Sequence, residues 1–341
     1  MRKHTARFSS KQVDYWFDAS FSIMETVFPK DRVVIITDEN IFEQHFKKFE
    51  GYRTIVLAPG EAYKQQGTVD GIINRLLEWQ ADKQTVIVGV GGGVITDMVG
   101  YSASIYKRGV KLIQVPTSIL AMVDAAVGGK NGVDVGEYKN QVGTIYQPEI
   151  VLFDYDFLST LPEEEWVNGF AEIIKHACIK DAAQFALLQE NTLADFQQDR
   201  TLLASLLEKN VSIKLNVVLN DEFETGDRKL LNFGHTIGHA IESTYNLSHG
   251  HAISIGMVMA AKISQQLAGL SGDECEAITN LLSQYKLPVR FNLHPEKIWG
   301  ILMNDKKREG ASMSFILLDK IGNGIVRPIP LTELKSMISS F

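Results

Sequence analysis

The sequence predicts an α/β doubly wound domain that is followed by a mostly α-helical domain. In the first half, short apolar runs rich in β-branched residues lie at 33–36, 54–57, 85–88 and 112–115. Continuous apolar runs of this kind fit strands that are buried on both faces of a parallel sheet. The helically spaced stretch 69–79 fits a crossover helix between two such strands. From about residue 160 the apolar spacing becomes helical, and strand signals nearly vanish until 314–318.

This change of pattern predicts two domains, 1–158 and 159–341. A chain of 341 residues is long enough for two substantial cores. A net charge of −7 argues against a broad nucleic-acid-binding face. The distant Cys178 and Cys275 indicate a reducing compartment, and no apolar run is long enough to cross a membrane. We therefore expect a cytoplasmic protein that binds neither nucleic acid nor membrane.

A glycine-rich turn lies between a predicted strand and a predicted helix. The strand 85–90 runs into Gly91, Gly92, Gly93 and Val94, and the helix follows at 95–106. Backbone N–H groups and the positive end of the helix dipole make such a turn suited to an anion. The alternative is a tight turn that only allows close helix–sheet packing. The sheet context favours pyrophosphate binding.

Cations gather among glycines after this turn, although the chain as a whole is acidic. Arg108 follows the predicted helix, Lys130 follows two glycines in a predicted loop, and Lys139 precedes Asn140. Any one of these could be a solvated surface residue. Together they favour an acidic substrate. Lys214 lies in a stretch where charge is scarce, and ion pairing with acidic residues at 221–224 is its alternative role.

The histidines favour a metal site. His235 and His239 share one face of a predicted helix, and His249 follows from a predicted loop. Glu172 lies on an apolar helix, where a carboxylate is costly to bury unless it is paired or bound to metal. The alternatives are a histidine-rich surface without a ligand and a surface ion pair of Glu172 with Lys175.

Ten short motifs, in one order, resemble those of the 3-dehydroquinate synthase family of sugar-phosphate cyclases. The resemblance as a whole covers most of the chain, from Asp38 to the segment 305–307. The motifs are GGGVxxD, a Tyr-x-Arg-Gly turn, QVPT, VDxxVGGK, KN, YQP, LPExE, GxAExIK, NxGHTxGHAIE and HGxA. The resemblance implies a Rossmann-like N-terminal domain and a helical C-terminal domain, with NAD+ and a metal ion in the cleft between them.

The resemblance also implies which residues bind the two cofactors. The metal ion, zinc or else cobalt, would be bound by Glu172, His235 and His249. The residues that would bind NAD+ are Asp38, Asn40, Glu61, Lys64, Gly91, Gly92, Gly93, Val94, Asp97, Thr117, Ser118, Lys130, Lys139, Phe157, Leu158, Ser159 and Thr160.

The implied substrate is 3-deoxy-D-arabino-heptulosonate 7-phosphate. Its carboxylate would be bound by Arg228 and Lys214, because arginine can contact a carboxylate through two hydrogen bonds. The residues expected at its phosphate are Lys130, Asn140, Asn232, His239 and either Lys306 or Lys307. Further catalytic residues would be Asp124 and Lys175, which orient hydroxyls and water, together with Lys139, Glu224 and Arg108, the last from either subunit of a homodimer.

The implied reaction has no net redox change. Transient oxidation by NAD+ acidifies a neighbouring C–H, phosphate leaves, the hydride returns, the ring opens and an intramolecular aldol step closes the carbocycle. Alternatives are a cyclase whose substrate lacks a carboxylate, a metal-dependent polyol dehydrogenase, and a silent NAD- or metal-binding regulator. Thr96, the segment 134–138 and His251 depart from the family pattern, and His251 is a rival to His249 as a ligand.

Overall fold

The computed structural model describes residues 1–136, 138–303 and 308–339. The chain forms two compact units, one made of Met1–Glu165 with Leu207–Leu215 and the other of Trp166–Leu206 with Asn216–Phe341. One long helix, α8 (Arg200–Asn220), supplies residues to both units. The domain boundary between residues 158 and 159 stays a prediction.

The first unit contains a seven-stranded sheet with the strand order β1-β2-β9-β6-β5-β3-β4. All neighbours are parallel except β1 and β2, which are antiparallel. The strands of this sheet are β1 (Arg2–Arg7), β2 (Gln12–Phe17), β3 (Val33–Asp38), β4 (Arg53–Leu57), β5 (Val86–Gly91), β6 (Lys111–Pro116) and β9 (Ile150–Phe153). The helices are α1 (Met24–Val27), α2 (Glu39–His45), α3 (Gln66–Glu78) and α4 (Gly93–Ile105). This arrangement confirms the predicted doubly wound domain.

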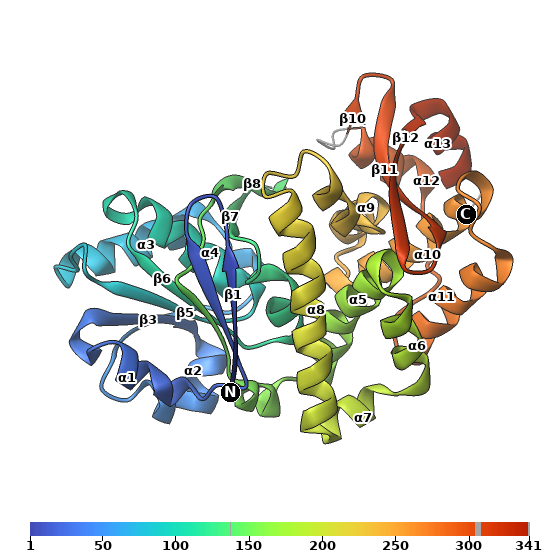
Figure 1. Ribbon diagram of the computed structural model, residues 1–341. Helices are drawn as coiled ribbons and strands as arrows, with labels where there is room; N and C mark the ends of the chain where they lie inside the picture. Colours follow the sequence, from blue (N-terminus) through green and yellow to red (C-terminus); the bar gives the residue numbers. More distant parts are fainter. Residues whose placement is uncertain (137, 304–307, 340–341) are drawn as a thin grey trace. The chain divides into compact units, whose positions relative to one another are not determined.

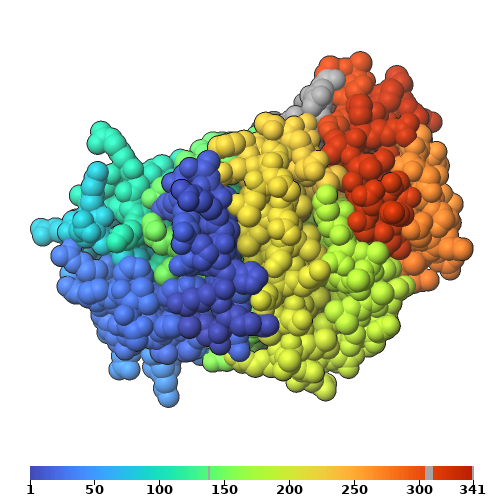
Figure 2. All heavy atoms as spheres, viewed as in Figure 1, coloured from blue at the N-terminus to red at the C-terminus, as the bar shows by residue number. Residues whose placement is uncertain are grey.

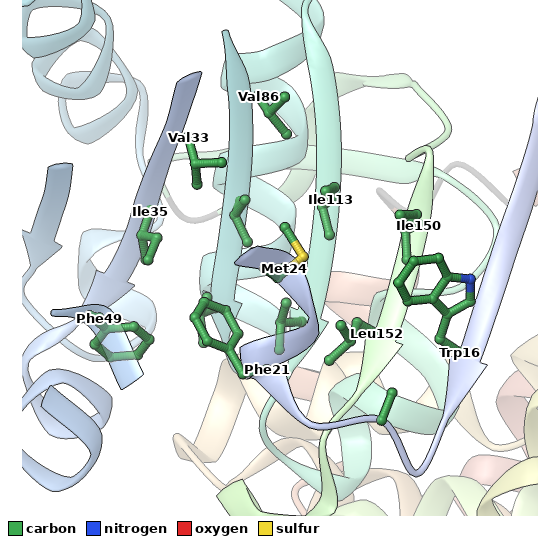
Figure 3. Packing of buried hydrophobic residues seen from close by; sticks show 14 of the residues in the cluster. Trp16, Phe21, Met24, Val33, Ile35, Phe49, Val86, Ile113, Ile150 and Leu152 are labelled. Carbon is green, nitrogen blue, oxygen red and sulfur yellow. The ribbon is translucent and has the colours of Figure 1, made fainter. Parts of the chain in front are cut away.

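Both faces of the sheet are buried, as the continuous apolar runs predict. Along β3, Val33 and Ile35 face one core, which also contains Phe21 and Met24 (Figure 3). Val34 and Ile36 face the opposite core, with side chains from α3 and α4. Successive side chains of a strand point to opposite faces, so a strand between two cores needs apolar residues at every position.

The order of the strands reverses between β3 and β5. From β3 the chain proceeds to β4 on one side, and from β5 it proceeds through β6 to β9 on the other. In open α/β sheets, ligands bind at the carboxyl ends of the strands beside such a reversal. Asp38 ends β3 and Gly91 ends β5, so both lie at this position.

Two antiparallel hairpins of the first unit were not predicted. β1 and β2 form one, and β1 lies exposed on the surface of the first unit (Figures 1 and 2). The other consists of β7 (Lys130–Val135) and β8 (Tyr138–Ile145). Lys130 therefore begins a strand, and the prediction that it lies in a loop was wrong. The glycines before it do turn the chain, since Gly128 and Gly129 have φ of 97° and 72°.

The second unit is mostly helical, as predicted, and adds a small antiparallel sheet. Its helices are α5 (Glu163–Lys180), α6 (Ala182–Glu190), α7 (Leu193–Gln198), α9 (His235–Tyr245), α10 (His249–Leu267), α11 (Gly272–Gln284), α12 (Pro295–Leu302) and α13 (Leu331–Ile338). The sheet strands are β10 (Arg308–Glu309), β11 (Ser312–Lys320) and β12 (Asn323–Pro330). Among the residues described, no helix is both long and apolar enough to cross a membrane.

Glycines allow α9 and α10 to pack at very short range. A Cβ on Gly256 of α10 would lie 2.1 Å from the backbone oxygen of Gly234 and 2.8 Å from the backbone nitrogen of Gly238. Gly234 precedes α9 with a φ of 77°, a conformation that favours glycine. Its own Cβ would lie 2.9 Å from the backbone nitrogen of Met257. A side chain at any of the three glycines would push the two helices apart.

We predict that Gly256→Ala destabilises the protein by about 1–3 kcal/mol, as overpacking in a tight core does. The backbone atoms in its way cannot turn aside as a side chain could. Gly71→Ala on α3 is the matched control, because no atom lies within 4 Å of its Cβ position. The stability of this control should equal that of the wild type or exceed it by about 0.5–1 kcal/mol, because alanine is favoured over glycine inside a helix. Thermal unfolding checks both variants, and equal unfolding temperatures would contradict the prediction.

Candidate functional site

Three helices of the second unit bring the predicted metal ligands together. Glu172 lies on α5, His235 is the first residue of α9, and His249 is the first residue of α10. One ligand atom from each side chain lies within 4.8 Å of the others. His249 thus belongs to the start of a helix, and its prediction as a loop residue was wrong. The rival ligand His251 is in none of the ligand clusters found among the described residues.

The separations within this cluster fit a small tetrahedral ion. Oε1 of Glu172 lies 3.4 Å from Nε2 of His235 and 3.2 Å from Nε2 of His249. Bonds of about 2.0–2.2 Å at tetrahedral angles separate neighbouring ligand atoms by roughly 3.3 Å. Nδ1 of His235 lies 3.1 Å from the backbone oxygen of Phe233, which orients the ring. Two imidazoles and a carboxylate are a donor set that suits zinc or cobalt.

A buried ammonium group shares Glu172 with the histidines. Lys175 is 1 % exposed, and its Nζ donates to Oε2 of Glu172. Burial acts to raise the pKa of Glu172, but Lys175 and His235 hold that pKa well below its ordinary value. The carboxylate is therefore ionised. The alternative of a Glu172–Lys175 ion pair is correct about the pair and wrong about its place, because both side chains are buried.

The two histidines predicted as ligands have pKa values shifted in opposite directions. Burial, and then the charge of Lys175, lowers the pKa of His235, so its ring is neutral and ready to bind a metal ion. Burial acts in the same direction on His249, but hydrogen bonds with Glu172 and Glu242 raise the pKa of His249 to about 9. Metal binding at Nε2 of His249 would thus release a proton.

His239 lies next to the cluster without belonging to it. Its ring centroid is 5.2 Å from that of His235 and 6.1 Å from that of His249. It does form a second close group of ligand atoms with Glu242 and His249. His239 is therefore a close neighbour of two predicted ligands, His235 and His249.

The loop 221–232 carries three predicted substrate residues of the second unit. Nδ2 of Asn232 donates to Oε1 of Glu224 over 2.9 Å. Arg228 is buried, and its guanidinium donates to the backbone oxygen of Glu222 over 2.5 Å. Asp221 organises this loop, because its carboxylate accepts hydrogen bonds of 2.7–3.0 Å from three backbone N–H groups.

In the first unit, the glycine turn has the predicted form. Gly92 precedes α4 and gives it no side-chain cap. A Cβ on Gly91 would lie 2.6 Å from Cβ of Ile95, so the turn closes tightly on its helix. Thr117 donates its backbone N–H to the oxygen of Gly91 over 3.0 Å, and Ser118 lies beside Gly92. Both interpretations made for this turn are thus compatible with its geometry, since it is tightly packed and also presents a helix N-terminus.

Lys64 joins several predicted residues of the first unit. Its Nζ lies 2.7 Å from Oδ2 of Asp97 and donates to Oδ1 of Asn140 over 2.6 Å. Burial acts to lower the pKa of Lys64, but Asp97 and Glu61 raise it above its ordinary value. Asp134 adds a further link, since its Oδ1 accepts the backbone N–H of Asn140 over 2.7 Å.

Asp124 and Lys214 also meet within the first unit. Asp124 lies in the π-helical turn Ala121–Ala125, and its Oδ1 is 2.6 Å from Nζ of Lys214. Lys214 also donates to the backbone oxygen of Asp124. Lys214 is thus ion-paired with Asp124, which lies 90 positions earlier in the sequence. π-helical turns often occur at functional sites.

The remaining predicted residues lie in several elements of the first unit. Phe157, Leu158, Ser159 and Thr160 are in the 3₁₀ segment Tyr155–Thr160, where His45 contacts Thr160 over 2.7 Å. Nζ of Lys139 lies 3.7 Å from Oε1 of Glu61. Arg108 is exposed, with a left-handed φ of 61°. Asn40 is on α2 and Val94 is on α4. Lys306 and Lys307 lie outside the described residues.

Sequence reasoning missed residues that support these groups. Glu242 contacts His249, and Asn168 accepts the backbone N–H of Gly250 beside it. Glu242 had a detectable signal, because it lies seven residues after His235 and so on the same face of the helix. Asn168 had no detectable signal in the sequence, because Gly250, which it contacts, lies 82 positions away.

Solved structures share this fold over nearly the whole chain. A 2-deoxy-scyllo-inosose synthase complexed with carbaglucose-6-phosphate, NAD+ and Co2+ is 26% identical, with a TM-score of 0.84, and the match covers 99% of this chain and 100% of that one. A 2-epi-5-epi-valiolone synthase from Streptomyces hygroscopicus subsp. jinggangensis 5008, with NAD+ and Zn2+ bound, is 24% identical, with a TM-score of 0.88 and coverage of 100% and 99%. The second likeness concerns the fold alone. These structures confirm the predicted fold class.

The sequence comparisons show the family. The family described as 3-dehydroquinate synthase N-terminal matches residues 54–168, and 3-dehydroquinate synthase C-terminal matches residues 169–308. A curated 3-dehydroquinate synthase from Campylobacter concisus (strain 13826) is 38% identical over 308 residues, which are 87% of this chain and 88% of that protein. The chain belongs to the 3-dehydroquinate synthase family, which confirms the resemblance drawn from its motifs.

We predict that Asp221→Asn loosens the loop that carries Arg228. Burial acts to raise the pKa of Asp221, but hydrogen bonds from the N–H groups of Gly226 and Thr225 lower it to about 2. The folded pKa is below the unfolded value of 3.8, so the carboxylate stabilises the loop above about pH 4 and loses this effect as the pH falls towards 2.

Hydrogen–deuterium exchange at neutral pH measures the effect. Exchange at residues 225–228 should become about 10-fold faster in Asp221→Asn, since hydrogen bonds to a charged group contribute about 1.5–3 kcal/mol. Asp227→Asn, an exposed change in the same loop, is the control and should leave exchange unaltered. Equal exchange in both variants would show that Asp221 does not organise the loop.

Proposed function

We propose that this protein is a 3-dehydroquinate synthase, which converts 3-deoxy-D-arabino-heptulosonate 7-phosphate into 3-dehydroquinate and phosphate. The observation that carries the proposal is the cluster of Glu172, His235 and His249 in a member of this family. The 38% identity to a curated enzyme of that activity supports the same substrate. We further propose a phosphate-eliminating lyase that depends on NAD+ and on a divalent metal ion.

The residues fit both cofactors. Glu172, His235 and His249 would hold zinc or cobalt, and three protein ligands leave a position for substrate hydroxyls. The glycine turn after β5 would hold the pyrophosphate of NAD+, with Asp38 at the end of the neighbouring strand β3. The solved 2-deoxy-scyllo-inosose synthase, which contains NAD+ and Co2+, supports this cofactor pair.

When bound, NAD+ supplies a transient hydride acceptor and the metal ion supplies a Lewis acid. The protein's own side chains bind, orient and move protons. Arg228 and Lys214 would bind the substrate carboxylate through charge-assisted hydrogen bonds. Lys175, paired with Glu172, and Asp124, paired with Lys214, would orient hydroxyls. His239 would donate or accept a proton close to the metal ligands.

The phosphate of the substrate would be bound by a separate group of residues. These are Lys130, Asn140, Asn232, His239 and one of Lys306 and Lys307. Glu224 would orient Asn232, and Lys139 would lie at the border between cofactor and substrate. Arg108 would add a charge, from the same or a partner subunit. The expectation of a cytoplasmic homodimer that binds neither nucleic acid nor membrane also stays a prediction.

We predict that the purified protein, supplied with zinc and NAD+, releases phosphate from 3-deoxy-D-arabino-heptulosonate 7-phosphate without accumulation of NADH. Phosphate and absorbance at the NADH wavelength are followed together, and a chelator should stop both turnover and phosphate release. Accumulating NADH would identify a polyol dehydrogenase instead. Turnover only with a phosphosugar that lacks the carboxylate would identify a cyclase of another substrate class.

Arg228→Lys tests the proposed contact with the carboxylate. Lysine keeps the charge but lacks the planar fork of the guanidinium. We expect kcat/KM to fall about 10- to 100-fold, because a charge-assisted hydrogen bond contributes about 1.5–3 kcal/mol. Lys335→Met removes an exposed cation of the same unit and serves as the control. An unchanged kcat/KM in Arg228→Lys would reject the proposed role of Arg228.

A further inference from the structure

We propose that Glu242 is a positioning residue for the candidate metal site, in that its carboxylate holds the Nδ1–H of His249 and so leaves Nε2 free to bind the metal ion. The inference rests on the proposed function, because it assumes a metal ion at Glu172, His235 and His249. Glu242 itself would not be a ligand.

The two nitrogens of His249 face two different carboxylates. Nε2 lies 3.2 Å from Oε1 of Glu172, and Nδ1 lies 3.4 Å from Oε2 of Glu242. A shift of a few tenths of an ångström would bring the second pair to the usual hydrogen-bond distance of about 2.7–3.2 Å. Histidines that bind metals commonly donate their other N–H to a carboxylate, which fixes the tautomer and strengthens the ligand.

The burial of Glu242 favours its hydrogen bond with Nδ1 of His249. Glu242 lies on α9, two helical turns after His235, and only 8 % of it is exposed. A carboxylate buried to this extent is costly unless a hydrogen-bonding partner compensates for the lost water. The same helix therefore supplies one ligand, His235, and orients another, His249.

The backbone of His249 is fixed independently of Glu242. The next residue, Gly250, donates its N–H to the side chain of Asn168 on α5. A Cβ on Gly250 would lie 2.3 Å from the backbone oxygen of Asn168, so α10 starts in close contact with α5. Because Asn168 holds the backbone here, only the side chain of His249 is left to rotate. The contact with Glu242 restricts that rotation.

The rival interpretation is a second metal site. Ligand atoms of His239, Glu242 and His249 also lie within 4.8 Å of one another. If both sites were filled, His249 would bind an ion at each nitrogen and would lose both of its ring protons. A neutral imidazole keeps one N–H, and Glu242 is the acceptor for it. One metal ion with Glu242 as a hydrogen-bond acceptor is therefore the simpler state.

The test is a zinc titration of the metal-free full-length protein against a competing chelator. We expect wild type to bind one equivalent. Glu242→Leu, which removes the acceptor, should bind zinc about 10- to 100-fold more weakly. Glu242→Gln keeps an acceptor oxygen but loses the charge, so its affinity should lie between the two. Glu274→Gln, a change at a carboxylate that caps α11 in the same unit, should match wild type.

Cobalt provides a readout that a purely structural role would not change. Visible absorption of the Co2+ form reports ligand geometry, and we expect its bands to shift in both Glu242 variants but not in Glu274→Gln. Thermal unfolding of the metal-free variants identifies any loss of fold in Glu242→Leu. Because Glu242→Gln has nearly the same shape as the native residue, it decides the question even if Glu242→Leu does not fold.

The outcomes separate the inference from the function on which it rests. One equivalent in wild type, with unchanged affinity and spectrum in Glu242→Gln and Glu242→Leu, would overturn the role of Glu242 and leave the metal site standing. Two equivalents in wild type, one of which is lost in Glu242→Gln, would overturn it in favour of the second site. No zinc binding by wild type would overturn the inference and the metal-dependent function together.

Discussion

The close packing of α9 against α10 is the constraint on which the candidate metal site depends. His235 begins α9 and His249 begins α10, so the distance between their backbones is set by how near the two helices come. Gly234, Gly238 and Gly256 permit that approach, since a Cβ on Gly256 would lie 2.1 Å from the backbone oxygen of Gly234. The glycines that flank the histidines in sequence therefore act on the site through helix packing. Metal sites tolerate little error in ligand position.

The charge of Glu172 is divided between two tasks. Oε2 accepts from the buried Lys175, whereas Oε1 faces both His235 and His249. The ion pair stabilises a carboxylate that burial would otherwise protonate. It also leaves the second oxygen available to a metal ion. The positive charge that keeps Glu172 ionised thus comes from Lys175, which lies about one turn further along the same helix. Lys175 itself need not bind the metal ion.

Local sequence patterns predicted the parallel strands and the glycine turn, because each depends on residues close together in the chain. The set of Glu172, His235 and His249 was implied by the family resemblance, since Glu172 lies 77 positions before His249. The continuous apolar run of β3 requires burial on both faces, and the structure has two cores there. The hairpin of β7 and β8 was missed, since strand-forming residues alternate in it with Gly132, Asp134 and Gly143. The contact of Asn168 with Gly250 spans 82 positions, and no local pattern reports such a pairing. The β7–β8 hairpin and the contact of Asn168 with Gly250 therefore both depend on tertiary packing and not on local propensity.

The contact between Lys64 and Asn140 gives a physical reason for linking the proposed cofactor and phosphate residues. An ammonium group can only donate, so its 2.6 Å contact fixes Oδ1 of Asn140 as the acceptor. The amide NH₂ of Asn140 then points away from Lys64 as a donor, which is the polarity that an anion needs. Asp134 holds the backbone of Asn140 at a φ of 53°, although the segment 134–138 departs from the family pattern. Because Lys64 also pairs with Asp97 on the helix after the glycine turn, any change of charge at that turn would act on the orientation of Asn140.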